Sequence, residues 1–217
     1  ASSLLALANW IAEQTGATVG YLTESANTVG AQWVGAQPQT GGKNAGQMLA
    51  GGLKAAILLN TEPEFDSAAG SAAAQALGQA EMVVTLSPFK ANMAFSDVLL
   101  PIAPFTETSG SFVNAEGRLQ SFHAVVKPLA ETRPAWKVLR VLANLLEIPG
   151  VAFETSQEVL ARATAKPLVA SNAIRAEIRL AGPVNAPVVA SIYQLDGTVR
   201  RAPSLQLTAD ARQEVAA

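Results

Sequence analysis

Residues that could hold a ligand gather in one stretch of this chain, between positions 107 and 120. Glu107, Glu116 and Arg118 could form a clamp there, because a guanidinium presents a fork of donors that suits a pyrophosphate. The same residues could instead form an internal ion pair. We favour the ion pair, because an irregular segment needs side chains to satisfy its backbone groups. The amide of Asn114 fits the same structural role, since it can bridge backbone groups across the loop.

Other residues in the chain offer little support for catalysis. Gly110 and Gly117 are expected to supply a positive φ or a close backbone approach. The glycine-rich residues 41–44 lack the order of a phosphate-binding loop. His123 has apolar neighbours and no second candidate ligand close in sequence, so we interpret it as structural. No nucleophile-elbow pattern surrounds Ser109, and serine hydrolase chemistry is therefore unsupported.

Two further charged groups lie outside that stretch. Glu62, Glu64 and Asp66 alternate through a turn that contains proline, and we interpret them as an exposed acidic cluster and not as a pair for acid-base catalysis. Arg200 and Arg201 could pair with acidic residues or with lipid headgroups, but two charges attract a membrane only weakly. We expect the segment that carries them to contact a neighbouring subunit.

The composition excludes several classes of partner and cofactor. The 217 residues carry 15 Lys and Arg against 17 Asp and Glu, a formal net charge of -2, so we expect no nucleic-acid partner. With no Cys and one His, these residues cannot supply a cysteine-ligated iron-sulfur cluster or a histidine-rich metal site. No apolar run approaches the roughly 18 residues that cross a bilayer, so we expect no direct membrane insertion. The start at Ala1, without an initiator Met, predicts that the chain belongs to something longer.

Alternating helical and strand patterns predict an α/β fold, a Rossmann-like parallel sheet flanked by helices. Continuous apolar runs such as residues 55–59 are typical of parallel strands that are covered on both faces. A strong apolar stripe follows Pro134, which can open a helix. Strands are expected at residues 19–22, 55–59, 82–86 and 98–100, helices at 3–14, 45–53, 67–77, 156–163 and from 134 to the stop at 149–150, and irregular segments at 27–46 and 104–120.

The expected division of the chain falls at residue 150. Residues 1–150 should form one α/β domain, and residues 151–217 a C-terminal extension made of a short helix and an extended, irregular tail. Trp136 is expected in the core, where truncation to alanine would cost about 3 to 5 kcal/mol. Apolar surface left open on the isolated chain predicts self-association.

Three segments resemble the signature of the molybdopterin oxidoreductase family in order, spacing and residue type. They are Ser-Asp-Val-Leu-Leu-Pro at 96–101, Glu-Thr-Ser-Gly-Ser-Phe-Val-Asn-Ala-Glu-Gly-Arg-Leu-Gln at 107–120, and Arg-Pro-Ala-Trp at 133–136. The departures are mild, with Ser111 where Thr is usual and Ala103 shortly after the first segment. The resemblance implies the parallel-sheet fold of that family. It also makes four residues candidates for an ancestral pterin cleft: Asn114, Glu116, Gly117 and Arg118.

Within that family, the chain is similar to the largest iron-sulfur subunit, the G chain, of bacterial NADH-quinone oxidoreductase, respiratory complex I. The similar segments are 96–104, 112–122, 127–142 and 193–206. This likeness implies a non-catalytic scaffold with no cofactor of its own, because the iron-sulfur clusters of such subunits lie in an N-terminal region outside these residues. It also implies contacts with other subunits of the peripheral arm, on the cytoplasmic side of the bacterial inner membrane.

A second interpretation is an enzyme fragment. The chain would then be the C-terminal part of an active molybdopterin oxidoreductase such as a formate dehydrogenase, and would contribute half of a pterin-guanine dinucleotide site. Such an enzyme usually needs a Cys, selenocysteine or Ser ligand for its metal upstream of these residues. We favour the scaffold, because residues 193–206 resemble the complex I subunit and no loop here offers a plausible metal ligand, and we expect these 217 residues to be inactive by themselves.

Overall fold

The computed structural model describes residues 2–23, 25–168 and 191–214, which group into two compact units. The first, here called the hairpin unit, contains the described residues of 1–40 and 103–184. The second, the sheet unit, contains the described residues of 41–102 and 185–217. The division expected at residue 150 stays a prediction.

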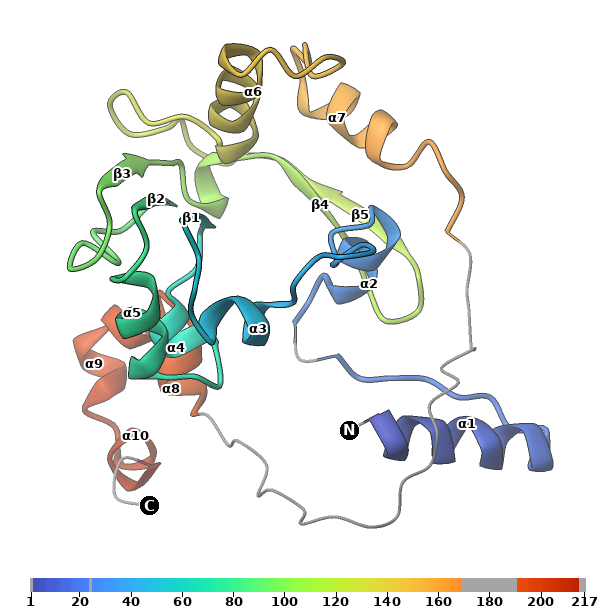
Figure 1. Cartoon of the computed structure of the whole chain (residues 1–217). Coiled ribbons are helices and arrows are strands. Elements are labelled where there is room, and N and C mark those ends of the chain that lie inside the picture. Colours follow the sequence, from blue (N-terminus) through green and yellow to red (C-terminus); the bar gives the residue numbers. More distant parts are fainter. Residues whose placement is uncertain (1, 24, 169–190, 215–217) are drawn as a thin grey trace. The chain divides into compact units, whose positions relative to one another are not determined.

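The sheet unit is built on three parallel strands in the order β1-β2-β3 (Figure 1). They are β1 (Ala55–Leu59), β2 (Met82–Ser87) and β3 (Val98–Pro101). In the register of the sheet, Ala55 of β1 pairs with Met82 of β2, and Val84 of β2 pairs with Val98 of β3. The predicted α/β class, with a parallel sheet flanked by helices, is confirmed, and all three strand predictions hold to within one residue. Short apolar runs between turn residues were a sufficient signal, because parallel strands are rich in such runs.

One short helix precedes β1, and two more lie between β1 and β2. They are α3 (Ala45–Leu49), α4 (Pro63–Asp66) and α5 (Ser71–Leu77). Asn44 and Gln47 form a reciprocal capping box at the start of α3. This helix ends before the predicted residue 53, because Gly51 and Gly52 both take a positive φ. Likewise α5 begins after the predicted residue 67, since Gly70 adopts φ 54° immediately before it.

The core of the sheet unit centres on β2 and α5. Val83, Thr85 and Leu86 of β2 are almost fully buried, as are Ala73 and Leu77 of α5. The outer strands differ: Ile57 on β1 and Val98 on β3 are 56% and 39% exposed. The expectation that residues 55–59 are covered on both faces is therefore wrong for β1, which is an edge strand.

The hairpin unit begins with α1 (Ser2–Thr15), which matches the helix predicted at 3–14. The strand predicted at 19–22 is wrong, since those residues pair with no strand and the hydroxyl of Tyr21 donates to Asn9 Oδ1 of α1 at 2.6 Å. A short apolar run predicts a strand only where a partner strand exists. The loop predicted at 27–46 contains a second helix, α2 (Thr28–Trp33).

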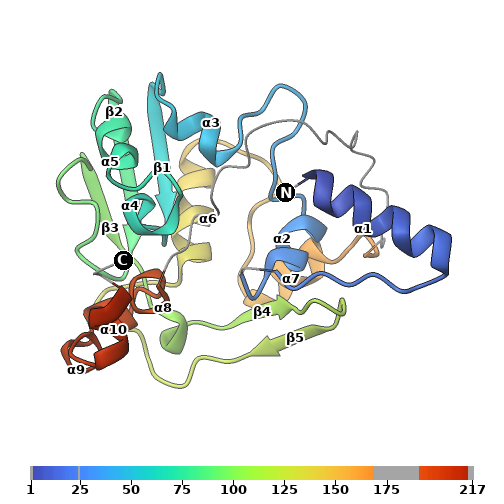
Figure 2. The same cartoon turned by 90° about the horizontal axis from the view of Figure 1, so that it is seen from below.

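A β-hairpin replaces most of the irregular segment predicted at 104–120. After a 3-10 turn at Phe105–Glu107, strands β4 (Gly110–Val113) and β5 (Leu119–Phe122) pair antiparallel. Each strand combines small or polar residues with apolar ones, and the rings of Phe112 and Phe122 meet edge to face with their centroids 5.4 Å apart. Helix α2 lies beside β4 in both Figure 1 and Figure 2.

Two helices predicted in the C-terminal half of the hairpin unit are present. They are α6 (Ala135–Leu145), with Pro134 at its N-cap, and α7 (Ser156–Ala163), where Thr155 Oγ1 accepts from the amide of Glu158. The expectation that Trp136 lies in the core is wrong: its ring is half-buried on a cavity wall, and α6 has no fully buried residue.

The described C-terminal segment, residues 191–214, is not the extended tail that its prolines suggested. It forms four short turns of helix: α8 (Ile192–Leu195), a 3-10 turn at Val199–Arg201, α9 (Pro203–Gln206) and α10 (Ala209–Glu214). Pro203 opens α9 at a position where the missing amide hydrogen costs nothing. Gln206 Nε2 donates to the carbonyls of Tyr193 and Val199 and ties these turns together. Residues 169–190, also assigned to that tail, lie outside the described residues.

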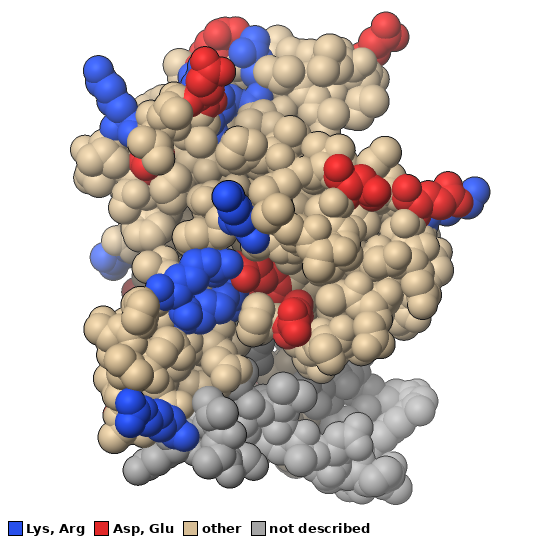
Figure 3. All heavy atoms as spheres, turned by 90° about the vertical axis from the view of Figure 1, so that its left-hand side faces the viewer, with Lys and Arg blue, Asp and Glu red and all other residues tan. Residues whose placement is uncertain are grey.

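Charged side chains are sparse on the surface. On the face drawn in Figure 3, blue and red groups are small, interspersed and separated by broad uncharged areas. This pattern follows from a composition in which 15% of residues are charged. Among the residues that the structure describes, no helix is both long and apolar enough to cross a membrane.

Candidate functional site

The residues singled out as an ancestral cleft form the turn of the β4–β5 hairpin. Asn114 Oδ1 accepts from the amides of Glu116 and Arg118, at 3.1 and 2.9 Å, so this side chain satisfies the backbone of the turn. Gly117 takes φ 81°, and its amide donates to the carbonyl of Asn114 at 2.9 Å. The hairpin therefore brings the four candidates together, and it uses the acceptor of Asn114 internally.

The ion pair expected between Arg118 and either Glu107 or Glu116 does not form. No contact of 4.0 Å or less joins these three described side chains. Glu107 Oε2 instead accepts from the amide of Leu129 at 2.9 Å and fixes the loop that follows β5. The backbone of the turn is instead satisfied by Asn114.

A second group of polar residues lies at the carboxyl edge of the parallel sheet. Thr61 and Glu62 follow β1, and Ser87 ends β2. Asn92, in the loop after β2, donates its side-chain amide to the carbonyl of Thr61 at 2.9 Å and so links the two loops. Open α/β sheets bind their ligands at this edge, beyond the carboxyl ends of the strands.

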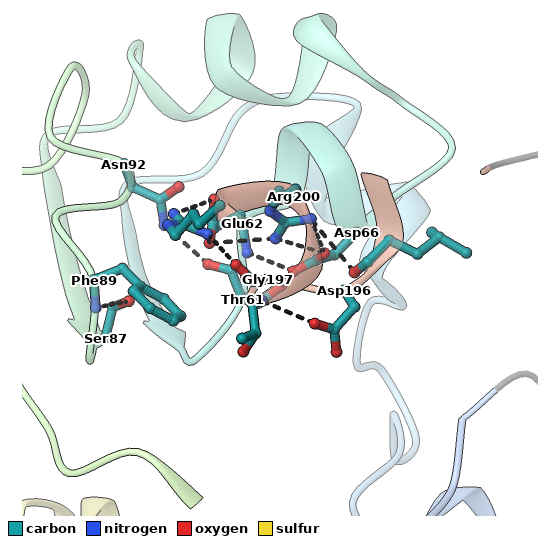
Figure 4. A network of polar contacts seen from close by, with 12 residues as sticks. Thr61, Glu62, Asp66, Ser87, Phe89, Asn92, Asp196, Gly197 and Arg200 are labelled. Carbon is teal, nitrogen blue, oxygen red and sulfur yellow. Dashed lines mark hydrogen bonds and ion pairs between the residues drawn. The ribbon is translucent and has the colours of Figure 1, made fainter. Parts of the chain in front are cut away.

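Two arginines from the C-terminal segment, Arg200 and Arg201, pair with Glu62 at this edge, and Figure 4 shows Arg200 between Glu62 and Asp66. Arg201 approaches both carboxylate oxygens of Glu62, with Nη1 at 2.8 Å from Oε1 and Nη2 at 2.9 Å from Oε2. Arg200 Nη2 lies 3.2 Å from Glu62 Oε1 and 3.3 Å from Asp66 Oδ1. Only 12% of the Glu62 side chain and 10% of the Arg200 side chain remain exposed. The edge is thus closed by a buried, bidentate ion-pair network.

Aromatic rings and backbone carbonyls hold the arginines in place. The guanidinium of Arg200 stacks over Phe65 at 4.7 Å, and that of Arg201 over Phe89 at 4.1 Å. Arg200 also donates to the carbonyl of Gln194, and Arg201 to that of Gly197 at 2.9 Å. The guanidiniums are consequently oriented both by carbonyls of the C-terminal segment and by rings of the sheet loops.

The network acts on the titration of Glu62. Burial raises the pKa of Glu62, but the hydrogen bond from Arg201 and the charge of Arg200 outweigh burial, and the pKa lies below its ordinary value. The carboxylate is therefore ionised at neutral pH and is a permanent partner for the two guanidiniums.

Sequence reasoning missed this network. It interpreted Glu62, Glu64 and Asp66 as a solvated cluster, which fits the exposed Glu64 but not the buried Glu62. Arg200 and Arg201 pair with acidic residues within the chain, and the contact of their segment with a neighbouring subunit stays a prediction. The sequence allowed the two arginines to pair with acidic residues. The signal in favour of that pairing was the presence of two adjacent arginines together with acidic residues that follow a strand.

Sequence comparison identifies the family. The chain belongs to the molybdopterin oxidoreductase family, which matches residues 1–145. This is the family whose signature the segments at 96–101 and 107–120 resemble.

Individual relatives match a shorter part of the chain. The 78 kDa subunit of mitochondrial NADH-ubiquinone oxidoreductase from Candida albicans is 43% identical over 53 residues, 24% of this chain and 7% of the relative. A Staphylococcus aureus protein (strain bovine RF122 / ET3-1) provisionally named formate dehydrogenase is 44% identical over 52 residues, 24% of this chain and 5% of the relative. The matched segments thus span a small fraction of each relative. One relative is named as a subunit of NADH-ubiquinone oxidoreductase and the other as a formate dehydrogenase, so the names do not separate the two interpretations.

At the sheet edge, the described residues offer few free donors to a pterin dinucleotide cofactor. Its pyrophosphate would need cationic donors. Arg200 and Arg201 at this edge are engaged by Glu62 and Asp66, whereas Arg118 in the hairpin turn forms no ion pair with a described residue. Asn114, the polar candidate in the hairpin, already accepts two backbone amide hydrogens of its own turn with its side-chain oxygen. Within the described part of the chain, no group of three or more His, Asp or Glu side chains is arranged to hold a metal ion.

Proposed function

We propose that this chain is a non-catalytic scaffold portion of the large iron-sulfur subunit of an NADH-quinone oxidoreductase. The observation that carries the proposal is the closed carboxyl edge of the sheet, where Arg200 and Arg201 pair with Glu62. An enzyme of this fold keeps that edge open for its ligand. A scaffold gains stability by filling it.

The proposal includes the surroundings of the chain. Electron transfer from NADH to quinone would run through iron-sulfur clusters outside these 217 residues. Other subunits of the peripheral arm would be the partners, on the cytoplasmic side of the bacterial inner membrane. The name of the Candida albicans relative supports this assignment.

The alternative is the C-terminal cofactor-binding fragment of an active molybdopterin oxidoreductase. The name of the Staphylococcus aureus relative supports it. This alternative requires that the arginines leave Glu62 when the cofactor binds, since the paired guanidiniums cannot serve a pyrophosphate at the same time.

Metal analysis separates the two functions. The natural protein that contains these residues would be purified from cells grown with molybdate, and its iron, molybdenum and pterin contents measured. The scaffold predicts iron without stoichiometric molybdenum or pterin. One molybdenum per chain would overturn the proposal and assign the cofactor-binding function instead.

A second experiment tests the partners. The same purification, carried out in a mild detergent, should recover the chain together with other subunits that oxidise NADH. Recovery of the chain with its iron but without any NADH-oxidising partner would contradict membership of the peripheral arm.

A further inference from the structure

A cavity of about 520 Å³ lies entirely inside the hairpin unit, where α2, the β4–β5 hairpin, the start of α6 and α7 converge. Its walls carry aliphatic and aromatic side chains, among them Val113, Leu119, Phe122, Trp136 and Leu160. This volume falls in the range of small-molecule sites, which are mostly apolar with a few polar groups that fix orientation. The network of Glu62 and its arginines belongs to the other unit and takes no part in it.

The walls of the cavity are fixed by hydrogen bonds between distant parts of the chain. Asn27, just before α2, accepts the amide hydrogen of Val113 in β4 at 2.8 Å. Trp33, at the end of α2, donates its indole N–H to the carbonyl of Lys166, beyond α7, at 2.7 Å. A Cβ at Gly30 would lie 2.1 Å from Asn27 Oδ1, so a side chain there would displace the first of these bonds. The space is consequently built into the unit and is not a gap between loose side chains.

The lining of the cavity has no Lys, Arg, Asp or Glu, and this restricts the ligands that the cavity can hold. The one titratable group of the lining, His123, is exposed. An ionic ligand would lose part of its hydration there without gaining an opposite charge. Phosphates, nucleotides and carboxylates are therefore disfavoured as occupants.

One polar pair inside the cavity can orient a ligand. The hydroxyls of Ser111 and Ser121 lie 2.8 Å apart across the hairpin, and a single hydrogen joins them. The second hydroxyl hydrogen of this pair remains available to an acceptor such as a carbonyl oxygen. Trp136 and Phe122 offer flat apolar surface on the same cavity.

We propose that the hairpin unit binds one uncharged, largely apolar small molecule that carries a hydrogen-bond acceptor, in the cavity between α2, α7 and the β4–β5 hairpin. The site is separate from the sheet edge and from the scaffold function, so either can fail without the other. Uncharged aromatic ketones have the required chemistry.

Prodan, an uncharged naphthalene ketone, is the probe for this site. Titrated into the 217-residue chain, it should bind saturably with one molecule per chain, shift its emission to shorter wavelength and quench tryptophan fluorescence. The anion 8-anilinonaphthalene-1-sulfonate has a similar ring and a sulfonate, and should bind at least about tenfold more weakly. Equal binding of the two probes would overturn the assigned charge of the ligand.

Two pairs of matched variants locate the binding. Ala163→Phe fills the cavity from α7, whereas Ala161→Phe adds the same ring on the same helix away from the lining. Ala31→Leu and Gln32→Leu form a second pair on α2, in which only the first lines the cavity. The proposal predicts a loss of prodan affinity of about tenfold or more in each cavity variant and little change in its control.

Several outcomes would overturn the proposal. They are the absence of saturable binding, equal binding by each cavity variant and its control, and displacement of prodan as the protein concentration rises. The last outcome would mean that a second copy of the chain covers the cavity. Thermal unfolding of all four variants shows which remain folded, and either pair alone suffices for the decision.

Discussion

The sheet unit and the hairpin unit both fix a polar loop, but with opposite chemistry. At the sheet edge, the carboxylate of Glu62 is held by guanidiniums from the C-terminal segment, and the charges are mostly buried. In the hairpin turn, Asn114 holds its own backbone with neutral hydrogen bonds between residues two and four positions apart. Ion pairs between residues far apart in sequence therefore join separate segments of the sheet unit, while hydrogen bonds between near neighbours shape a single turn of the hairpin unit.

This contrast predicts how each region fails. Removal of one partner of a buried ion pair leaves the other charge desolvated and uncompensated, which costs more than the pair contributed. Removal of a local hydrogen bond at a partly exposed turn lets water replace the lost partner. We expect substitutions at the sheet edge to be the more damaging.

Glu62→Gln tests the sheet edge and should have the largest effect. The change keeps the shape of the side chain but leaves Arg200 and Arg201 without their shared carboxylate, so we expect a loss of about 3 kcal/mol in the free energy of unfolding. Urea denaturation measures it. Glu64→Gln, at an exposed position two residues on, is the control and should change stability by less than about 0.5 kcal/mol. Equal effects in the two variants would contradict the burial of the network.

Acidification should weaken the same contact. Because the pKa of Glu62 in the folded chain lies below its ordinary value of 4.5, the carboxylate stabilises the fold above that pH. The contribution is lost as the pH falls through the lowered pKa, when Glu62 takes up a proton. The difference in unfolding free energy between the wild-type chain and Glu62→Gln should therefore shrink from neutral pH to about pH 3. A difference that does not change with pH would refute the assigned role of the charge.

Trp136→Ala tests the cavity wall. A fully buried ring would cost about 3 to 5 kcal/mol, but this one is half-buried beside open space, so we expect about 2 kcal/mol. Trp10→Ala on α1, where the ring is 53% exposed, should cost less than about 0.5 kcal/mol. A loss above about 3 kcal/mol for Trp136→Ala would restore the core position that the sequence predicted.

Asn114→Ala tests the hairpin turn and should have the smallest effect. The amides of Glu116 and Arg118 lose an acceptor but stay close to water, so we expect about 1 kcal/mol in the same denaturation assay. Glu116→Ala, at an exposed position in the same turn, is the matched control and should be near neutral. If Asn114→Ala matched Glu62→Gln in cost, the contrast between the two regions would not hold.

Local patterns predicted the elements that depend on local physics. The runs at 55–59 and 82–86 became β1 and β2, since each is apolar, short and bounded by turn residues. The stripe after Pro134 became α6. The strand expected at 19–22 failed, because its pairing needed a partner that a single segment does not reveal.

The site was less predictable than the fold. Asn114 as a backbone bridge followed from its position in a glycine-containing loop, and the geometry agrees. The partner of Glu62 could not be inferred in the same way, since 139 residues separate it from Arg201. The cavity was equally hidden, because α2 was expected to be loop and the hairpin to be irregular.

That separation also orders events during synthesis. A ribosome that adds about 5 to 20 residues per second makes Arg201 roughly 7 to 28 seconds after Glu62, because Arg201 is 139 positions further along the chain. Over that interval β1, β2 and β3 can already pair, while Glu62 keeps its water. The pairing of Glu62 with the arginines is consequently among the last steps in the folding of this unit. If synthesis stopped before residue 200, the released chain would have a formed sheet whose edge is still hydrated and negatively charged.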